Sequence, residues 1–399
     1  MIQTYIKPKL TAKLVERETY SDYYITVESP NVGAVEEQVA AIYAEAIELV
    51  VEKEIQVLQE KIHGSADALD AFCKAREKLF EKAGLDKSLP FTYVEGRPLD
   101  GQDIVSLQIW GIVAKSDSIK VEKHFESETP SFLWKTKDFE LLYSPQIHGY
   151  DEKDKENKPN VTDQCQTMFE RCSSVLDNFG MDFKRVARTW IYCRRLLDWY
   201  GELNRVRTEH FKKAGIFSTG KPPVYPASTG IQGRFGNEEC FLDLLAVKNV
   251  SEKGIEMTPI VTTSRQHQAF GYGSAFSRGM VLTHEGYRTV YVSGTASINT
   301  AGESTYIGNA EIQALDTLMN IAALLEDQGG SLKDIHMGVV YCKTQEVYQD
   351  YKRALRLLGI PEMPLVCVEA DVCRHELLIE IELVAVIKDG DSNTARWQP

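Results

Sequence analysis

Apolar residues return at helical spacing in three long segments of the chain. The segments cover about Val35 to Glu54, Thr162 to Phe179 and Asn309 to Gln328. In each of them, an apolar stripe that returns every three or four residues predicts a helix that packs one face against a sheet. Gly180 and Gly329 follow the second and third segments, and they predict that these helices stop there.

Runs of β-branched and aromatic residues, which are typical of strands, lie between these helices and at the end of each stretch. VARTWIYC and IHMGVVYC are each followed by a second amphipathic segment, and IVSLQIWGI, CFLDLLAVK and LLIEIELVAVI end the three stretches. The second amphipathic segments end at Gly84, Gly215 and Gly359. Helices that alternate with such strand-like runs indicate an α+β fold.

The order of elements recurs because the sequence repeats itself. The copies in the middle and at the end of the chain align Gln164 with Gln313, Gly180 with Gly329 and Tyr192 with Tyr341 (341 − 192 = 149). A more diverged copy in front aligns Arg76 with Arg207 and Gly84 with Gly215 (215 − 84 = 131). We therefore predict three units of one fold, over residues 1–115, 138–250 and 287–388, and a flexible tail over 389–399. Three copies in one chain suggest a pseudo-threefold body with sites in the clefts between units.

Composition narrows the class of protein. With 43% apolar residues among 399, the chain can bury a large core, and its formal charge of −13 argues against nucleic acid as a partner. The start MIQTYIKPKL lacks the pattern of a signal peptide and no apolar run has the length of a membrane span, so we expect a cytoplasmic protein without a membrane partner. The eight cysteines form no C-x-x-C pair and the histidines form no H-x-x-x-H or H-E-x-x-H pattern. We therefore expect no metal and no cofactor.

Two carboxylates stand out on the closing strand of the last unit. Aligned by the repeat, Glu380 and Glu382 correspond to Phe241 and Asp243 in the second unit and to Ser106 and Gln108 in the first. Burial between Ile379 and Ile381 would raise the pKa of the Glu380 carboxyl, so that it carries a proton near neutral pH. Such an acid can protonate an enol ether if it faces a cleft, whereas on an ordinary amphipathic strand it would face solvent.

Two sets of motifs resemble known families. VSGTASINTAGES, NIAALLEDQGGSLKDI, VVYC and EIELVAV, between residues 290 and 387, resemble the Rid (YjgF-like) superfamily of chorismate-mutase-like α+β subunits. PASTGI at Pro226 to Ile231 and VCRHELLIEIE at Val372 to Glu382 resemble the chorismatases, which are single chains of Rid-like units. The resemblance implies a pseudo-trimeric, barrel-like body, either monomeric or a homo-oligomer. It also implies a hydrolase of secondary metabolism that removes pyruvate from chorismate and gives 3-hydroxybenzoate or a dihydroxycyclohexadiene carboxylate.

The same resemblance implies roles for particular residues. Glu380 takes the place of the catalytic glutamate. Chorismate is a small metabolite with two carboxylates, for which Arg374 and Arg278 are the candidate partners, and surface salt bridges are the alternative for both arginines. Ser228 and Thr229 are candidate hydrogen-bond donors to the substrate, or residues of a plain turn.

Residues near these candidates receive weaker assignments. The resemblance implies that Cys373, with a small residue near Gly286, shapes the pocket toward 3-hydroxybenzoate, and a buried apolar role is the alternative for the cysteine. We interpret Asn204 and Arg207 as part of a solvated helix face.

Other functions of the same scaffold stay open at this point. One is a non-catalytic Rid-like protein that binds a small carboxylated metabolite, and another is a Rid-type imine deaminase or a ribonuclease. Imine-hydrolysing Rid proteins have an arginine after the proline that enters the penultimate strand. Here Leu365 follows Pro364 and Phe91 follows Pro90, which argues against the deaminase. The negative charge argues against the ribonuclease.

Overall fold

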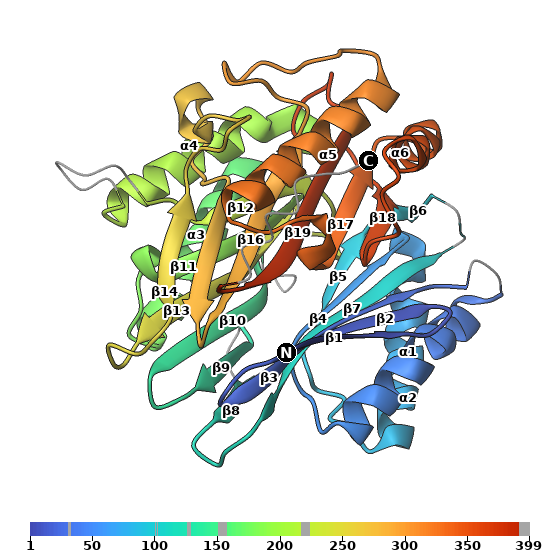
Figure 1. Cartoon of the computed structure of the whole chain (residues 1–399), viewed down its shortest axis with the longest axis vertical. Coiled ribbons are helices and arrows are strands. Elements are labelled where there is room, and N and C mark those ends of the chain that lie inside the picture. Colours follow the sequence, from blue (N-terminus) through green and yellow to red (C-terminus); the bar gives the residue numbers. More distant parts are fainter. Residues whose placement is uncertain are drawn as a thin grey trace.

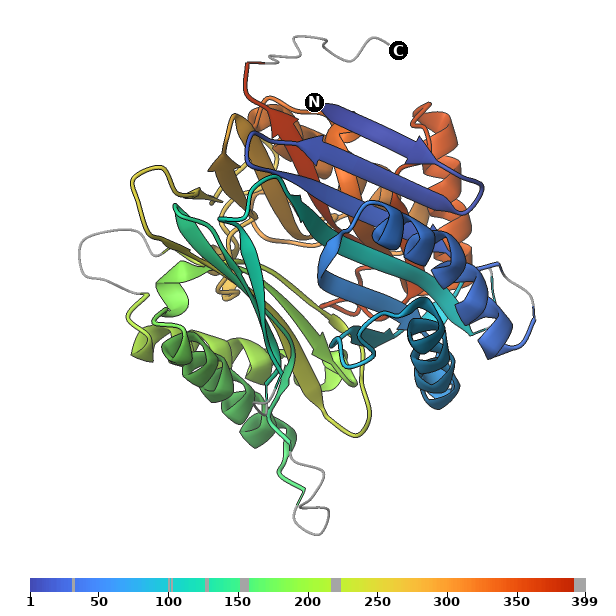
Figure 2. The same ribbon diagram turned by 90° about the horizontal axis from the view of Figure 1, so that it is seen from below.

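The computed structural model describes residues 1–30, 33–99, 101, 103–125, 129–150, 158–216 and 224–390. Within these residues, two sheets of six strands and one of seven follow one another along the chain (Figure 1). Each sheet packs against a pair of long helices, and Figure 2 shows the three helix pairs on the outside of the body, with the sheets inside. The α+β fold of three repeated units is confirmed.

The first sheet has the strand order β1-β2-β3-β7-β4-β5. It consists of β1 (Ile2–Ile6), β2 (Leu10–Glu16), β3 (Tyr20–Glu28), β4 (Gln56–Gly64), β5 (Thr92–Glu95) and β7 (Ile104–Ala114). Helices α1 (Val35–Glu52) and α2 (Leu69–Ala83) pack against it.

The second sheet has the strand order β12-β11-β13-β10-β9-β8. It consists of β8 (Lys120–His124), β9 (Ser131–Lys135), β10 (Phe139–His148), β11 (Val186–Cys193), β12 (Ala227–Gln232) and β13 (Cys240–Asn249). Helices α3 (Val161–Asn178) and α4 (Leu196–Lys213) pack against it.

The third sheet has the strand order β14-β15-β16-β19-β17-β18-β6. It consists of β14 (Glu256–Ile260), β15 (Gly279–His284), β16 (Tyr287–Ala296), β17 (Ile335–Cys342), β18 (Leu365–Glu369), β19 (Ile379–Lys388) and β6 (Arg97–Pro98). Helices α5 (Ala310–Asp327) and α6 (Gln345–Leu357) pack against it. Short 3-10 turns cover Ala66–Ala68, Phe183–Arg185, Ala269–Tyr272 and Leu332–Asp334. Within the part of the chain that the structure describes, no helix has both the length and the apolar character needed to cross a bilayer.

The predicted long helices are confirmed to within two residues at each end. Gly180 and Gly329 adopt positive φ angles of 62° and 73°, which allows the chain to leave α3 and α5 in the left-handed conformation. The sheets extend beyond the predicted units, because the β8–β9 and β14–β15 hairpins add strands from the stretches between them. Most of the predicted tail, from residue 391 onward, lies outside the described residues.

The inner faces of the three sheets share one apolar core. Trp110 of the first sheet, Trp190 of the second and Tyr291 of the third belong to it, and the last two rings meet edge to face at 6.3 Å. Three further cores fill the space between each sheet and its helix pair. The central core holds the three units together, so the clefts between units have fixed walls.

The prediction of a barrel-like body is wrong in one respect, since the described sheets do not close into a barrel. Strand pairing stays within each unit except for β6, which comes from the first unit and pairs with β18, and an isolated bridge between Ala227 and Ser277. The edge strands β1, β8 and β14 have no strand partner from a neighbouring sheet among the described residues. The units therefore join through side-chain packing rather than through a continuous ladder of backbone hydrogen bonds.

Candidate functional site

The candidate acid Glu380 lies on β19, at the cleft between the second and third units. It pairs with Tyr341 of β17, as Phe241 pairs with Tyr192 in the second sheet and Ser106 pairs with His63 in the first. The predicted correspondence of the three closing strands is confirmed by these registers. One equivalent position in each unit thus holds a carboxylate, a phenyl ring or a hydroxyl.

Glu380 faces a cavity of about 210 Å³ with walls from both units. The second unit contributes α4 and β12, and the third contributes the segment before β15, the end of β16 and the segment before β19. The lining residues are Tyr200, Asn204, Arg207, Ser228, Gly230, Ser274, Phe276, Arg278, Gly294, Ala296, Ile298, Cys373, Arg374 and Glu380.

A bulge in β16 makes room for the Glu380 side chain. The register between β16 and β19 shifts between Val292 and Thr295, and Gly294 lies within that irregularity. A Cβ at position 294 would stand only 2.9 Å from the carboxyl carbon of Glu380 and 3.2 Å from Cγ2 of Thr229. Only a glycine leaves the acid this position without displacing it.

Burial and, to a smaller extent, the nearby carboxylate of Glu382 raise the pKa of Glu380 to about 8. A hydrogen bond from the Cys373 thiol and the charge of Arg188 lower the pKa and limit the shift. Glu380 is 4% exposed, so water does little to stabilise the ionised form of its side chain. At neutral pH it is mostly protonated, so it can donate a proton to a molecule in the cavity.

Glu382 is also buried, and it is ion-paired. Its carboxylate accepts hydrogen bonds from Arg188 Nη2 at 2.6 Å and from the Tyr341 hydroxyl at 2.9 Å. The same Arg188 nitrogen donates to Thr229 Oγ1 at 2.5 Å, and Thr229 Oγ1 also accepts from the Gly294 amide at 3.0 Å. The two carboxyl groups therefore have different surroundings. Glu380 faces the cavity, whereas Glu382 forms buried hydrogen bonds with Arg188 and Tyr341 behind the cavity wall.

Three guanidinium groups line the cavity with Glu380. Arg278 is 2% exposed and donates from Nε to the carbonyl oxygen of His267 at 2.8 Å. Arg374 donates from Nη1 to the carbonyl oxygen of Gly302 at 2.9 Å and to Ser304 Oγ at 3.1 Å. These backbone anchors orient both arginines, and the charges suit a ligand with carboxylates.

Arg207 is the third of these arginines, and its interpretation as part of a solvated helix face is wrong. It is 2% exposed, donates to Asn204 Oδ1 at 2.6 Å, and its Nε has no hydrogen-bond partner among the described residues. The Arg207 and Arg278 guanidinium carbons lie 5.8 and 5.9 Å from the ring centroid of Phe276, within reach of a cation–π interaction. The alignment of Arg207 with Arg76, which is also buried, was the available signal in the sequence.

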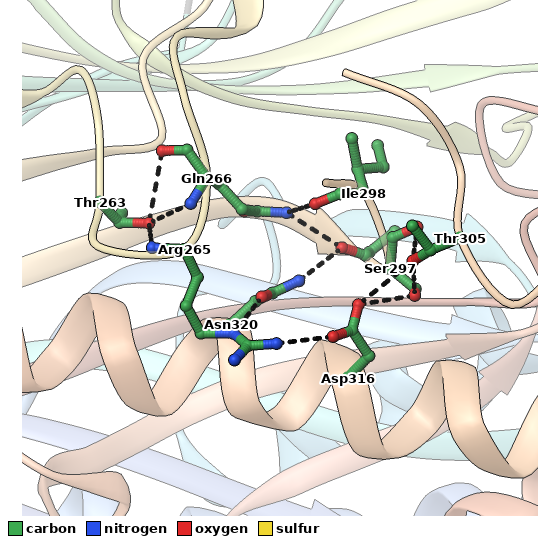
Figure 3. A network of polar contacts seen from close by, with 9 residues as sticks. Thr263, Arg265, Gln266, Ser297, Ile298, Thr305, Asp316 and Asn320 are labelled. Atoms are coloured by element: carbon green, nitrogen blue, oxygen red, sulfur yellow. Dashed lines mark hydrogen bonds and ion pairs between the residues drawn. The ribbon is translucent and has the colours of Figure 1, made fainter. Parts of the chain in front are cut away.

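A polar network fixes the segment that leads to Arg278 (Figure 3). Gln266 donates from Nε2 to the carbonyl oxygens of Ala296 and Ile298, both at 3.1 Å. Arg265 donates to Asn320 Oδ1 at 2.8 Å and to Asp316 on α5 at 2.7 Å. Because Ala296 and Ile298 line the cavity, this network holds one of its walls against α5.

The remaining predicted residues divide into those at the cavity and those away from it. Ser228 and Cys373 line the cavity, whereas Thr229 supports it from below through Arg188 and Gly294. Gly286 lies in the turn between β15 and β16, where its carbonyl oxygen accepts from the Asp389 amide. Asp389 follows Glu380 by nine residues along an extended strand (389 − 380 = 9), so Gly286 is roughly 30 Å from the acid. The small residues near Glu380 are Gly294 and Ala296 instead.

The described residues contain no group of three histidine, cysteine, aspartate or glutamate side chains that could hold a metal ion. The cavity brings together the carboxyl group of Glu380 and the guanidinium groups of three arginines. Such a set can bind an anion and transfer a proton to it.

Comparison with known proteins finds one matching family model and several similar proteins. The family described as Endoribonuclease L-PSP matches residues 271–387. A chorismatase from Streptomyces rapamycinicus is 26% identical over 230 residues, which are 53% of this chain and 67% of that protein. A 3-hydroxybenzoate synthase from Streptomyces hygroscopicus is 27% identical over 244 residues, which are 55% of this chain and 67% of that protein.

A solved chorismatase structure has the same fold. It matches with a TM-score of 0.62 at 17% identity and covers 93% of this chain and 100% of its own. The likeness therefore extends over all three units and not only over the last one. The chain is therefore similar to chorismatases in sequence and in fold, and its last unit matches the family described as Endoribonuclease L-PSP.

Proposed function

We propose that the chain removes pyruvate from chorismate, with Glu380 as the general acid. The observation that carries the proposal is the carboxyl of Glu380, buried at the wall of a cavity that three guanidinium groups also line. The names of the two Streptomyces relatives support chorismate as the substrate. No cofactor is needed, because the reaction requires only proton transfer and capture of a cation.

The reaction begins with the proton of Glu380. Its transfer to the methylene carbon of the enolpyruvyl group produces an oxocarbenium ion, which either water or a ring hydroxyl captures. Capture by water releases pyruvate and leaves a dihydroxycyclohexadiene carboxylate. Capture by the ring hydroxyl consumes no water and forms a cyclic ketal. The ring C–O bond of that hydroxyl then breaks and the ring loses a proton, so that the ring keeps the ether oxygen as 3-hydroxybenzoate while pyruvate leaves. The Glu380 carboxylate recovers its proton before the next turnover.

The arginines hold the substrate in place for this step. Chorismate has two carboxylates, and we assign them to Arg207, Arg278 and Arg374, with Ser228 as a further donor at the wall. Two of these arginines are fully buried, which strengthens their attraction for a carboxylate. Fixed anchors on both sides of the ligand would keep the enol ether near Glu380.

We assign the choice of product to the surroundings of Glu380. The Cys373 thiol hydrogen-bonds the acid and lies within the cavity, while Gly294 and Ala296 leave space on the other side. A cavity that leaves no room for water beside the cation favours capture by the ring hydroxyl, and hence 3-hydroxybenzoate. Cys373→Ala should therefore raise the share of the diol.

A Glu380→Gln variant tests the proposal, with Glu326→Gln, an exposed position on α5, as the control. Purified proteins are incubated with chorismate, pyruvate is quantified with lactate dehydrogenase, and the ring products are separated by chromatography. Pyruvate release by the wild type and by Glu326→Gln, but not by Glu380→Gln, is the expected result. Equal release by both variants would overturn the assignment of the acid. Binding of chorismate without product in the wild type would favour a binding protein.

A single chain should suffice for activity, because both walls of the cavity come from one polypeptide. We place the reaction in the cytoplasm, where cysteines stay reduced, since none of the eight forms a disulfide within the described residues. Sedimentation of the active species measures whether it is a monomer.

A further inference from the structure

A second cleft, between the first and third units, repeats the position of the Glu380 cavity in the pseudo-threefold arrangement. Val366 of β18 occupies the place in its ladder that Thr229 of β12 occupies in the second sheet. Tyr351 of α6 takes the place of Arg207 on α4, since both lie eight residues before a glycine that follows the helix (359 − 351 = 8; 215 − 207 = 8). The second cleft has a volume of about 750 Å³, compared with about 210 Å³ around Glu380.

The third pseudo-equivalent position, between the first and second units, is filled by side chains. Phe241, which corresponds to Glu380, stacks on Tyr192 with ring centroids 4.8 Å apart. Phe235 packs edge to face against Phe241 at 6.4 Å. The cleft between the first and third units thus differs from both others, because it is wide and has no carboxylate at the position of Glu380.

The second cleft is cationic although the chain as a whole carries a formal charge of −13. Its charged lining residues are Lys9, Lys13, Lys333 and Lys352, against Glu28 and Glu362. Lys13 is half-buried and donates to the carbonyl oxygen of Lys333 at 2.9 Å, across the boundary between the two units. The ammonium group of Lys352 lies 5.1 Å from the ring centroid of Tyr348. Cations beside aromatic rings suit an anion that has an aromatic or apolar body.

Two buried hydroxyl groups in this cleft are left without a partner. Thr26 is 3% exposed and Ser29 is 2% exposed, and both line the cleft. Their Oγ atoms accept and donate no hydrogen bond among the described residues. A buried hydroxyl without a partner costs free energy, and a polar ligand in the cleft would remove that cost.

We propose that this cleft binds a small anion with an aromatic or apolar body, at a site separate from Glu380. The lysines supply the charge, the hydroxyls of Thr26 and Ser29 supply hydrogen bonds, and Tyr348 and the apolar side chains around Leu365 contact the body of the ligand. The volume of the cleft lies in the range of small-molecule sites. The proposal stands independently of the reaction at Glu380.

The probe for this site is 8-anilinonaphthalene-1-sulfonate, an aromatic anion whose fluorescence rises on binding. We expect saturable binding of one probe per chain to the full-length protein, unchanged in Glu380→Gln and not displaced by chorismate. Joint replacement of Lys13 and Lys352 by methionine should weaken binding about tenfold, whereas Lys253→Met, an exposed control, should not. Absence of saturable binding, displacement by chorismate or an equal effect of Lys253→Met would overturn the proposal.

Two further measurements distinguish loss of the binding site from loss of folding. Thr26→Val removes a hydroxyl that has no partner within the described chain, so it should weaken probe binding without lowering the melting temperature. The thiol of Cys367 lines the cleft and is half-buried, as is that of Cys73 on α2. Alkylation followed by mass spectrometry should show that the probe protects Cys367 and leaves Cys73 unchanged. Equal protection of both thiols, or of neither, would place the probe elsewhere and refute the site.

Discussion

The rate of pyruvate release should fall as the pH rises through about 8, and Glu382→Gln should move that fall to lower pH. A general acid works only in its protonated form, and burial raises the pKa of Glu380 to about 8. With this value, about nine-tenths of the protein carries the proton at about pH 7 and about one-tenth at about pH 9, so the rate should drop about tenfold between them.

Glu382 affects this titration through its charge. Its carboxylate raises the pKa of Glu380, and the glutamine variant removes that charge. The variant also leaves the Arg188 guanidinium without an anionic partner, and a nearby cation lowers the pKa of a carboxyl group. Both changes act in the same direction. Tyr341→Phe is the matched control, because it removes the hydroxyl that donates to Glu382 but keeps the carboxylate.

The assay is kcat/KM for chorismate from about pH 6 to about pH 10, since this quantity reports the ionisation of the free enzyme. Chromatography quantifies the ring product directly, and circular dichroism checks that each protein stays folded at each pH. A wild-type rate that is constant or rises between about pH 7 and 9 would refute the role of Glu380 as an acid. An unchanged midpoint in Glu382→Gln would refute the electrostatic coupling between the two carboxylates.

Three further predictions follow from the same cavity. The pKa of Glu380 is higher in the folded protein than its ordinary value of 4.5, so folding stability is lost as the pH rises from about 4.5 to about 8. At about pH 8, the unfolding free energy of Glu380→Gln should therefore exceed that of the wild type by on the order of 4 kcal/mol, and the variant should melt at a higher temperature. Near pH 4 the two proteins should differ little, and calorimetry measures both differences. Gly294→Ala should lower kcat at least about tenfold while the protein stays folded, since the added methyl group displaces the acid. Arg207→Met should raise KM for chorismate about tenfold, and Arg205→Met, an exposed neighbour, should leave steady-state kinetics unchanged.

Hydrophobic periodicity was sufficient to predict the long helices, because their buried stripes recur at a spacing that no other element has. The internal repeat was sufficient to align Glu380 with Phe241 and Ser106. In all three sheets, the residue at this position pairs with the equivalent residue of the neighbouring strand, so the repeat in the sequence corresponds to a repeat in the register. The acid could therefore be assigned to a cleft between units before its neighbours were known.

Features that depend on packing between units could not be predicted. Arg207 is a charged residue on α4, and the segment around Phe276, which follows the second sheet in the chain, lies against its guanidinium group in the folded protein. The strand β8, with the sequence KVEKH, has Val121 as its one apolar residue, and it joins the sheet through its hairpin with β9. The family resemblance implied a small pocket residue near Gly286, but antiparallel pairing takes Gly286 to the far end of β19.

The joining of three units in one chain explains how a site with a buried acid is tolerated. In a symmetric trimer each substitution occurs three times, so a carboxyl with a pKa of about 8 would lower stability at all three clefts. Here the cost, on the order of 4 kcal/mol above about pH 8, arises once. The equivalent positions hold Phe241, which stacks on Tyr192, and Ser106, which carries no charge. The two other clefts need not accommodate a buried carboxyl group. The cleft between the first and third units can therefore be wide and lined by lysines.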